Sequence, residues 1–208
     1  MATRIALDGV GGQGVRLIAG ILGALLARMG KEVTVLFDYD SSVRGSMSDA
    51  FVIFDDKPIA NPVVEEADIV LKLADKGHLR ISGRMVVTDL GLGRPGDEQI
   101  PFASLGSAYF GKELFGNMIA LGRLLRLAEI DFDETAIRES LPRRYQDENV
   151  AAIHFGYALT HEEIDQLASV APPSRFEMND AATAPLHRKT GIGTGGQADA
   201  GASATETG

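Results

Sequence analysis

The stretch Gly9-Val10-Gly11-Gly12-Gln13-Gly14-Val15 decides the fold of this chain. It follows a short apolar run, residues 5–7, and it opens a segment in which apolar residues recur at helical spacing as far as Met29. We therefore predict a strand, a glycine-rich turn and a helix over 15–29. A turn of this kind points backbone N–H groups and the positive end of the helix dipole at an anion. The stretch predicts a site for a phosphate-bearing ligand.

Further apolar runs predict strands at 33–37, 50–54, 69–73 and 85–88, and Gly30 is well placed just past the end of the first helix. The last two runs are typical of strands buried on both faces of a parallel sheet. From Gly116 onward the spacing is helical, with capping signals at 131–134 and 160–163 and a further helix over 149–159. The pattern predicts a Rossmann-like α/β fold, a doubly wound, mostly parallel sheet with a helical C-terminal part.

Composition excludes several classes of protein. The chain has 208 residues, a net charge of −9 and no cysteine. The acidic balance argues against a nucleic-acid partner, and no apolar run approaches the roughly 20 residues of a membrane span. Without cysteine, the chain cannot form disulfides, thiolate zinc sites, iron–sulfur clusters or a cysteine nucleophile. Its four histidines share no spacing of metal-ligand type, so we expect no metal site, and with no visible signal peptide we expect a cytoplasmic protein.

The chain divides into a globular part and a tail. Residues 1–171 have the composition of one domain, whereas residues 172–208, which begin at Pro172-Pro173, are rich in Gly, Ala, Thr and Ser. The tail has too few large apolar residues to offset the entropy of ordering. We predict that it is disordered unless it docks on a partner subunit.

The glycine stretch has more than one interpretation. Gly9, Gly11 and Gly14 satisfy the pattern G-x-G-x-x-G, and Asp38 ends the second predicted strand where a dinucleotide-binding domain places the carboxylate that binds the ribose. A stand-alone NAD(P)-binding oxidoreductase domain is therefore one interpretation. Another is that the glycines bind nothing and only allow a tight turn with close helix packing.

A second polar segment, residues 39–48, follows the second predicted strand and contains Arg44 and Ser48. Loops that follow parallel strands gather at one edge of the sheet, so we expect this segment to lie beside the glycine turn. Arg44 would then face the same anion, because its guanidinium can donate two hydrogen bonds to a phosphate or carboxylate. The alternative is a solvated turn with an incidental arginine.

Several motifs recur in a fixed order along residues 3–160. They are the glycine stretch at 9–15, the segment Arg44-Gly45-Ser46-Met47-Ser48, Ile59 with Pro62, Ala67-Asp68, Asn117 with Leu121-Gly122, and Asn149 with Ala152 and Gly156. In this order and spacing the chain resembles the gamma subunit, or the equivalent fused domain, of the 2-oxoacid:ferredoxin oxidoreductases. Ser46 stands where that family has a second glycine.

The resemblance implies a subunit of an enzyme complex that oxidatively decarboxylates a 2-oxo acid to its acyl-CoA, a reaction of anaerobic metabolism. It implies that thiamine diphosphate with Mg²⁺ and the [4Fe-4S] clusters belong to alpha, beta and ferredoxin-like delta subunits. The electron acceptor is left open, ferredoxin or, through a further subunit that carries FAD, NAD. Which 2-oxo acid reacts is also left open.

For this chain the resemblance implies a part in coenzyme A binding and subunit assembly, with no catalytic residue of its own and no activity alone. The candidate binding residues are Gly9, Gly11, Gly12, Gln13, Gly14, Arg44, Gly45, Ser48 and Asn117. Asn117 has an alternative role as a cap of the helix that it begins.

Overall fold

The structure is a computed structural model that describes residues 1–39, 47–74 and 81–170. Its strands are β1 Thr3–Val10, β2 Glu32–Tyr39, β3 Met47–Asp55, β4 Glu66–Lys72, β5 Ser82–Asp89 and β6 Glu98–Ile100. Its helices are α1 Val15–Arg28, α2 Phe102–Phe110, α3 Gly116–Leu127, α4 Glu134–Ser140, α5 Gln146–Ala158 and α6 His161–Val170, with a 3-10 turn η1 at Glu113–Phe115. The predicted strands and helices are all present, whereas β6, α2 and η1 were not predicted. The predicted tail at 172–208 lies outside the described residues.

The strands form one sheet in the order β2-β3-β1-β4-β5-β6. Strands β1, β4, β5 and β6 pair in parallel, while β3 pairs antiparallel with both β1 and β2. The predicted α/β class with a mostly parallel sheet is confirmed. The sequence did not predict that β2, although parallel to β1, is separated from it by β3.

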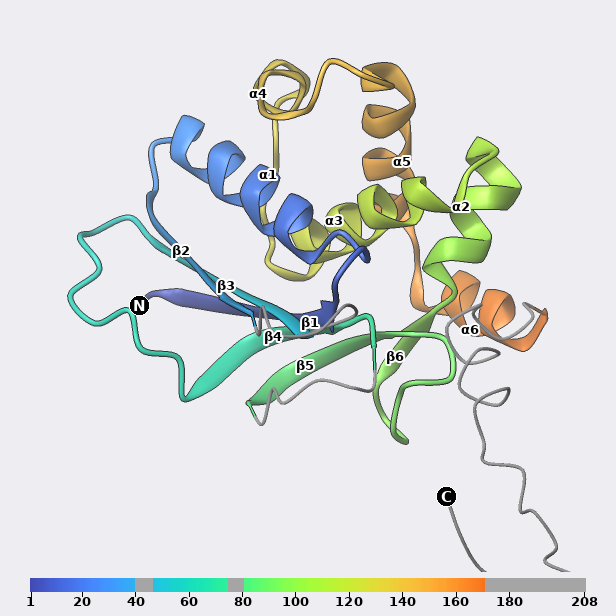
Figure 1. The fold of residues 1–208 in the computed structure, drawn as a ribbon, viewed down its shortest axis with the longest axis horizontal. Helices are drawn as coiled ribbons and strands as arrows, with labels where there is room; N and C mark the ends of the chain where they lie inside the picture. The colour runs from blue at the N-terminus through green and yellow to red at the C-terminus, as the bar shows by residue number, and fades with distance from the viewer. Residues whose placement is uncertain (40–46, 75–80, 171–208) are drawn as a thin grey trace, which may run out of the picture.

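The main core lies between the sheet and the helices. Alternate residues of β1, such as Ile5 and Leu7, are fully buried in it, together with Ile18 and Leu22 of α1 and Ile119 of α3. The helices α1, α3, α4 and α5 lie on the same side of the sheet, and α6 lies at its β6 end (Figure 1). A smaller cluster that contains Ala6, Ala67 and Val70 occupies the other face. Most of the core therefore lies on the face of the sheet that the helices cover.

Two glycines set the ends of α1. Gly14 precedes the helix with φ of 80°, and Gly30 follows it with φ of 79°, conformations that other residues rarely adopt. The N–H groups of Gly30 and Lys31 donate to the carbonyl oxygens of Ala27 and Leu26, which closes the last turn. The position predicted for Gly30 is confirmed.

The helices α3 and α5 cross at two glycines. A Cβ atom at Gly122 would overlap the backbone carbonyl oxygen of Ile153, and one at Gly156 would overlap that of Ile119. Asn149, at the start of α5, donates its side-chain amide to the carbonyl oxygen of Arg144, 3.2 Å away. Gly122 and Gly156 therefore serve helix packing, and Asn149 makes a local hydrogen bond at the start of α5.

A buried ion pair joins this helical layer to the edge of the sheet. The guanidinium of Arg123 donates Nε to Oε1 of Glu98 over 2.6 Å and Nη2 to Oε2 over 2.5 Å. Its Nη1 donates to the carbonyl oxygen of Leu159 over 2.6 Å. Only 4% of the Arg123 side chain is exposed. Because α3, β6 and the end of α5 meet at this one group, they hold one another in place.

No helix in the described part of the chain is both long and apolar enough to cross a membrane.

Candidate functional site

The glycine stretch forms a tight loop between β1 and α1. Gly12 and Gly14 have φ of 99° and 80°, so a side chain at either position would be strained. Gly9 has ordinary dihedral angles, but a Cβ there would lie 2.6 Å from a methyl carbon of Val15. Gly9, Gly12 and Gly14 are thus needed for the turn itself, and α1 begins immediately after it. A phosphate site at this helix end remains a prediction.

Gln13 holds the loop to the sheet. Its side chain is buried, and its Oε1 accepts a hydrogen bond from the backbone N–H of Val10 over 2.8 Å. Its Nε2 donates to the carbonyl oxygen of Leu73, at the end of β4, over 2.7 Å. Both polar atoms of the amide therefore have partners within the chain. For a ligand contact the Gln13 side chain still offers the second hydrogen on Nε2 and the second lone pair of Oε1.

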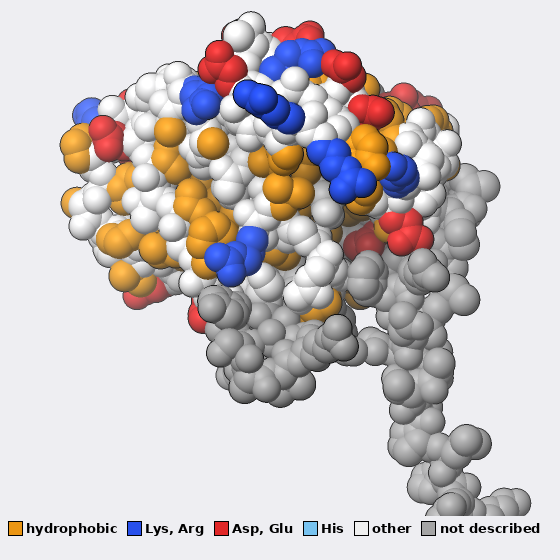
Figure 2. Space-filling model, turned by 45° about the horizontal axis from the view of Figure 1, so that its top comes forward, with side chains coloured by type: hydrophobic (Ala, Val, Ile, Leu, Met, Phe, Trp, Pro, Cys, Tyr) orange, Lys and Arg blue, Asp and Glu red, His pale blue; other side chains and the backbone are white. Residues whose placement is uncertain are grey.

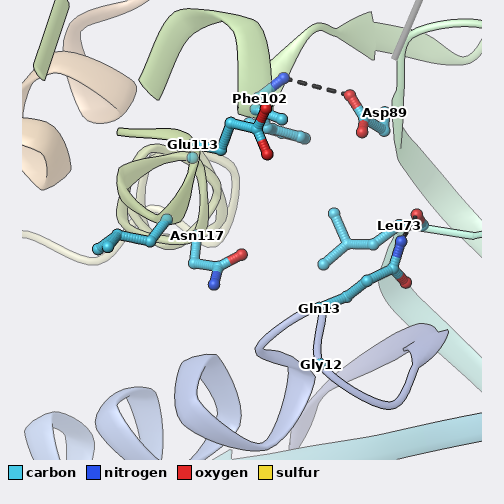
Figure 3. Close-up of a pocket in the computed structure, with 10 residues that line it drawn as sticks. Gly12, Gln13, Leu73, Asp89, Phe102, Glu113 and Asn117 are labelled. Atoms are coloured by element: carbon cyan, nitrogen blue, oxygen red, sulfur yellow. Dashed lines mark hydrogen bonds between the residues drawn. The ribbon is translucent and has the colours of Figure 1, made fainter. Parts of the chain in front are cut away.

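Asn117 lies in the first turn of α3 and faces the glycine loop. A Cβ at Gly14 would overlap the amide of Asn117, so the two residues are packed against each other. The helix α3 has no side-chain cap, which removes the capping role considered for Asn117. Within the described ranges no group hydrogen-bonds to the Asn117 amide, and in Figure 3 this amide points into the space above Gln13 and Leu73. Its hydrogen-bonding groups are available to a ligand.

A cavity of about 240 Å³ lies between these residues. It is lined by Gly12, Gln13, Leu73, Asp89, Phe102, Ala103, Glu113, Leu114, Gly116 and Asn117. These residues come from the carboxyl ends of β4 and β5, the glycine loop, and the starts of α2 and α3 with η1 (Figure 3). Ligands of open α/β sheets bind at this edge. The cavity is therefore the candidate functional site.

The charge of the lining is negative. Asp89 is 4% exposed, and its Oδ1 accepts from the backbone N–H groups of Leu90 over 3.0 Å and of Phe102 over 3.2 Å, so that it caps α2. Glu113 adds a second carboxylate, and the described lining residues include no Lys or Arg. A phosphate inside the cavity would meet these carboxylates without a cation from the lining. The cavity suits an uncharged, hydrogen-bonding group better than a phosphate.

The end of the second polar segment, Ser48, lies beside the glycine stretch. Ser48, in β3, pairs in register with Gly9 of β1 and is 9% exposed. The start of β3 therefore adjoins the glycine loop. Arg44 and Gly45 lie outside the described residues, and their contact with a ligand stays a prediction.

The position of Asp38 does not match a dinucleotide-binding domain. Asp38 pairs with Asp49 of β3, which in turn pairs with Asp8 of β1. Asp38 is therefore two strand spacings, roughly 10 Å, from β1. In the dinucleotide-binding order the second strand is adjacent to the first. The NAD(P) interpretation that used Asp38 beside Gly9, Gly11 and Gly14 is corrected on this point, because β3 intervenes.

Some lining residues were not predicted. Asp89 directly follows the predicted strand 85–88, and an acidic residue at the end of a buried parallel strand is a signal that could have found it. Phe102 and Glu113 belong to α2 and η1, which the sequence pattern did not reveal. In the part of the chain that is described, no group of three or more His, Asp or Glu residues could hold a metal ion.

Comparisons with known proteins agree with this fold. A family model described as pyruvate ferredoxin/flavodoxin oxidoreductase matches residues 4–159. The 2-oxoglutarate synthase subunit KorC of Methanocaldococcus jannaschii is 30% identical over 179 residues, which cover 78% of this chain and 96% of that protein.

Solved structures are similar in fold. The gamma subunit of a keto/oxoacid ferredoxin oxidoreductase from Geobacter sulfurreducens matches with a TM-score of 0.62 and 23% identity, over 80% of this chain and 98% of that one. A 2-oxoglutarate:ferredoxin oxidoreductase from Magnetococcus marinus, solved with 2-oxoglutarate, coenzyme A and succinyl-CoA bound, matches with a TM-score of 0.58 and 19% identity. That match covers 84% of this chain and 32% of the other.

Proposed function

The chain belongs to the pyruvate ferredoxin/flavodoxin oxidoreductase family, as the gamma subunit of a 2-oxoacid oxidoreductase, and we propose that its complex converts 2-oxoglutarate and coenzyme A to succinyl-CoA. The name of the KorC relative supports 2-oxoglutarate as the first substrate to test. The reaction releases CO₂ and two electrons, which pass to ferredoxin or another acceptor. The resemblance to gamma subunits found in the sequence is confirmed.

In this proposal the redox chemistry belongs to other subunits. The chain has no cysteine to ligate an iron–sulfur cluster. Thiamine diphosphate with Mg²⁺ and the [4Fe-4S] clusters are therefore assigned to alpha, beta and ferredoxin-like delta subunits. Thiamine diphosphate supplies the carbanion chemistry of decarboxylation, and the clusters supply electron transfer. This chain binds and positions the acyl acceptor.

The observation that carries the coenzyme A assignment is the amide of Asn117. It has no hydrogen-bonding partner among the described residues, and it points into the cavity beside the glycine loop (Figure 3). The pantetheine arm of coenzyme A is uncharged and carries two amide groups, which suit a cavity whose charged side chains, Asp89 and Glu113, are both carboxylates. Its phosphates belong outside this cavity, toward the rim of the glycine loop and Arg44.

The test measures the assembled complex with 2-oxoglutarate, coenzyme A and a low-potential dye as acceptor. Asn117→Ala is expected to raise the KM for coenzyme A about tenfold, the worth of one hydrogen bond to a neutral group, and to leave the KM for 2-oxoglutarate unchanged. Asn61→Ala, in an exposed turn at the other end of the sheet, is the matched control. An unchanged KM for coenzyme A in the Asn117 variant would remove the cavity from the proposal.

Calorimetry tests the phosphate contact separately. If Arg44 binds the 3′-phosphate, Arg44→Ala in the complex is expected to lower the affinity for coenzyme A more than the affinity for its 3′-dephospho form. If both ligands lose the same affinity, Arg44 contacts the pyrophosphate instead. Equal affinity of wild type and variant for both ligands would take Arg44 out of the site. A complex that turns over no 2-oxo acid would refute the function as a whole.

A further inference from the structure

Two basic side chains contact one tyrosine on the helical side of the molecule. Nζ of Lys112 donates to the hydroxyl oxygen of Tyr145 over 2.6 Å and lies 3.9 Å from the centre of its ring. Nη2 of Arg144 donates to the same oxygen over 3.0 Å, with its Cζ 4.7 Å from the ring centre. Arg143 precedes Arg144 in the sequence and is exposed. We call these four residues the Tyr145 patch.

The basic groups of the patch have no carboxylate partner. Neither Lys112, Arg143 nor Arg144 has an ion pair within the described ranges, although the chain carries a net charge of −9. The nearby Asp147 is paired with Arg138 over 2.6 Å. Like charges held close together repel each other, so the arrangement becomes favourable when an anionic group joins it.

The tyrosine itself is held in one place. Tyr145 precedes α5 with φ of 56°, a conformation that few residues other than glycine adopt. Its ring packs edge-on against Phe115 at 5.8 Å between centres, and Phe115 is fully buried. Such a conformation persists only where the surroundings hold it. The patch is therefore a preformed surface that needs little ordering to bind.

Apolar residues flank the patch. Tyr109, three residues before Lys112, is 59% exposed, and Leu114, two residues after it, is 45% exposed. The Tyr109 ring rests on Phe155 at 4.8 Å between centres. On this side of the molecule, Lys and Arg side chains lie next to hydrophobic surface (Figure 2). Exposed Tyr with Arg is the composition of protein–protein interface centres rather than of ordinary surface.

We propose that the Tyr145 patch, with Tyr109 and Leu114, is a docking surface for a carboxylate-rich segment of another subunit of the same complex. The occupant follows from charge and shape together: the basic groups select carboxylates, and the exposed Tyr and Leu select a protein surface over a small anion. The inference rests on the proposed function only in that the chain works within a complex. Through these residues the subunit is held in its complex.

Assembly is the direct measurement. The alpha–beta assembly is immobilised, and the purified chain is titrated onto it at 50 mM and at 300 mM salt. The variant Lys112→Glu with Arg144→Glu is expected to bind at least tenfold more weakly at low salt and to lose most of the salt dependence. Tyr109→Ser is expected to weaken binding without changing the salt dependence. The matched control is Lys57→Glu with Arg84→Glu, two exposed basic residues outside the patch.

The results separate the alternatives. An affinity and salt dependence equal to wild type in the patch variant would overturn the proposal. Normal assembly with a raised KM for coenzyme A would also overturn it, because the patch would then bind a small phosphate ligand. The neutral variant Lys112→Met with Arg144→Met guards against misfolding and should weaken assembly in the same direction. Loss of assembly in a complex that turns over no 2-oxo acid would still support docking while refuting the proposed function.

Discussion

The side-chain amide of Gln13 donates a hydrogen bond to the carbonyl oxygen of Leu73 over 2.7 Å. This bond ties the glycine loop to the end of β4, while Oε1 of the same amide closes the loop on the N–H of Val10. The sheet itself therefore sets the position of the loop, before any ligand binds. A residue that suggested ligand binding in the sequence has a structural role in the fold.

Replacing Gln13 should destabilise the domain. Gln13→Ala would leave the N–H of Val10 and the carbonyl of Leu73 without their partners, and we expect a loss of about 1–3 kcal/mol in the free energy of unfolding. Urea denaturation of the purified chain measures it. The exposed substitution Lys57→Ala should change stability by less than about 0.5 kcal/mol. Equal midpoints for Gln13→Ala and Lys57→Ala would mean that the two hydrogen bonds contribute nothing.

Gly14 and Asn117 should show a coupled effect. Gly14→Ala meets both a positive φ and the amide of Asn117. We expect a loss of about 2–3 kcal/mol in stability, of which about 1 kcal/mol is backbone strain that remains when Asn117 is also changed to Ala. A double-mutant cycle in urea measures the coupling. Strictly additive losses would show that the side chain of Asn117 moves aside at no cost.

Two glycines in helices should respond in opposite directions to the same substitution. Gly122→Ala would push a methyl group into the carbonyl of Ile153, and we expect a loss of about 1–3 kcal/mol as α3 and α5 separate. Gly20→Ala, on the exposed face of α1 with nothing near the new methyl, should gain about 0.5–1 kcal/mol from helix propensity. Thermal unfolding of both variants compares them. A stabilising Gly122→Ala would contradict the close helix crossing.

Removing one partner of the Arg123–Glu98 ion pair should lower stability more than removing both. Arg123→Met leaves the largely buried Glu98 carboxylate without its arginine partner and with only the exposed His161, whose Nδ1 lies 3.3 Å away, and we expect a loss of about 3–5 kcal/mol. Changing Glu98 to Met as well should recover part of that loss, because no unpaired charge is left. Urea denaturation of the single and double variants measures both free energies of unfolding. A double variant that is less stable than Arg123→Met would show that the unpaired Glu98 carboxylate is not what destabilises the single variant.

Tyr145 should titrate below the ordinary range of tyrosine. Hydrogen bonds from Lys112 and Arg144 hold its pKa below 10.0, whereas the hydrogen bond to Asp131 raises the pKa of Tyr157. Because the folded-state pKa is lowered, the resulting stabilisation is complete only above the unfolded-state pKa near 10. It is lost as pH falls through the folded-state value. Lys112→Met should raise the pKa of Tyr145 and leave Tyr157 unchanged in a ¹³C-tyrosine NMR titration. An unmoved Tyr145 would contradict the contact.

The parts of the fold that were predicted have strong local signals. The helix α1 is bounded by Gly14 and Gly30, and α6 begins at a capping box in which Thr160 and Glu163 exchange hydrogen bonds. The helix α2 was missed because its sequence includes Gly106, a poor helix former, which lets the helix pack closely on the backbone of Gly116. Tertiary packing compensates there for weak local propensity.

The position of β3 was missed for a different reason. Strand periodicity reports which residues face the core, but it does not report the neighbours of a strand. The seven residues between β2 and β3 are too few for a parallel crossover, and this length favours the antiparallel pairing that the structure has. That pairing is what separates Asp38 from β1.

The sequence by itself determined the strand–turn–helix start, the α/β class and the family, because glycines, caps and apolar spacing act over a few neighbouring residues. Only the tertiary structure decided that β3 separates β1 from β2, that Gln13 binds Leu73, and that Asp89 and Glu113 line the cavity beside Asn117. It also brought Lys112 to Tyr145. These contacts join residues far apart along the chain, and their formation depends on how the elements pack rather than on any local preference.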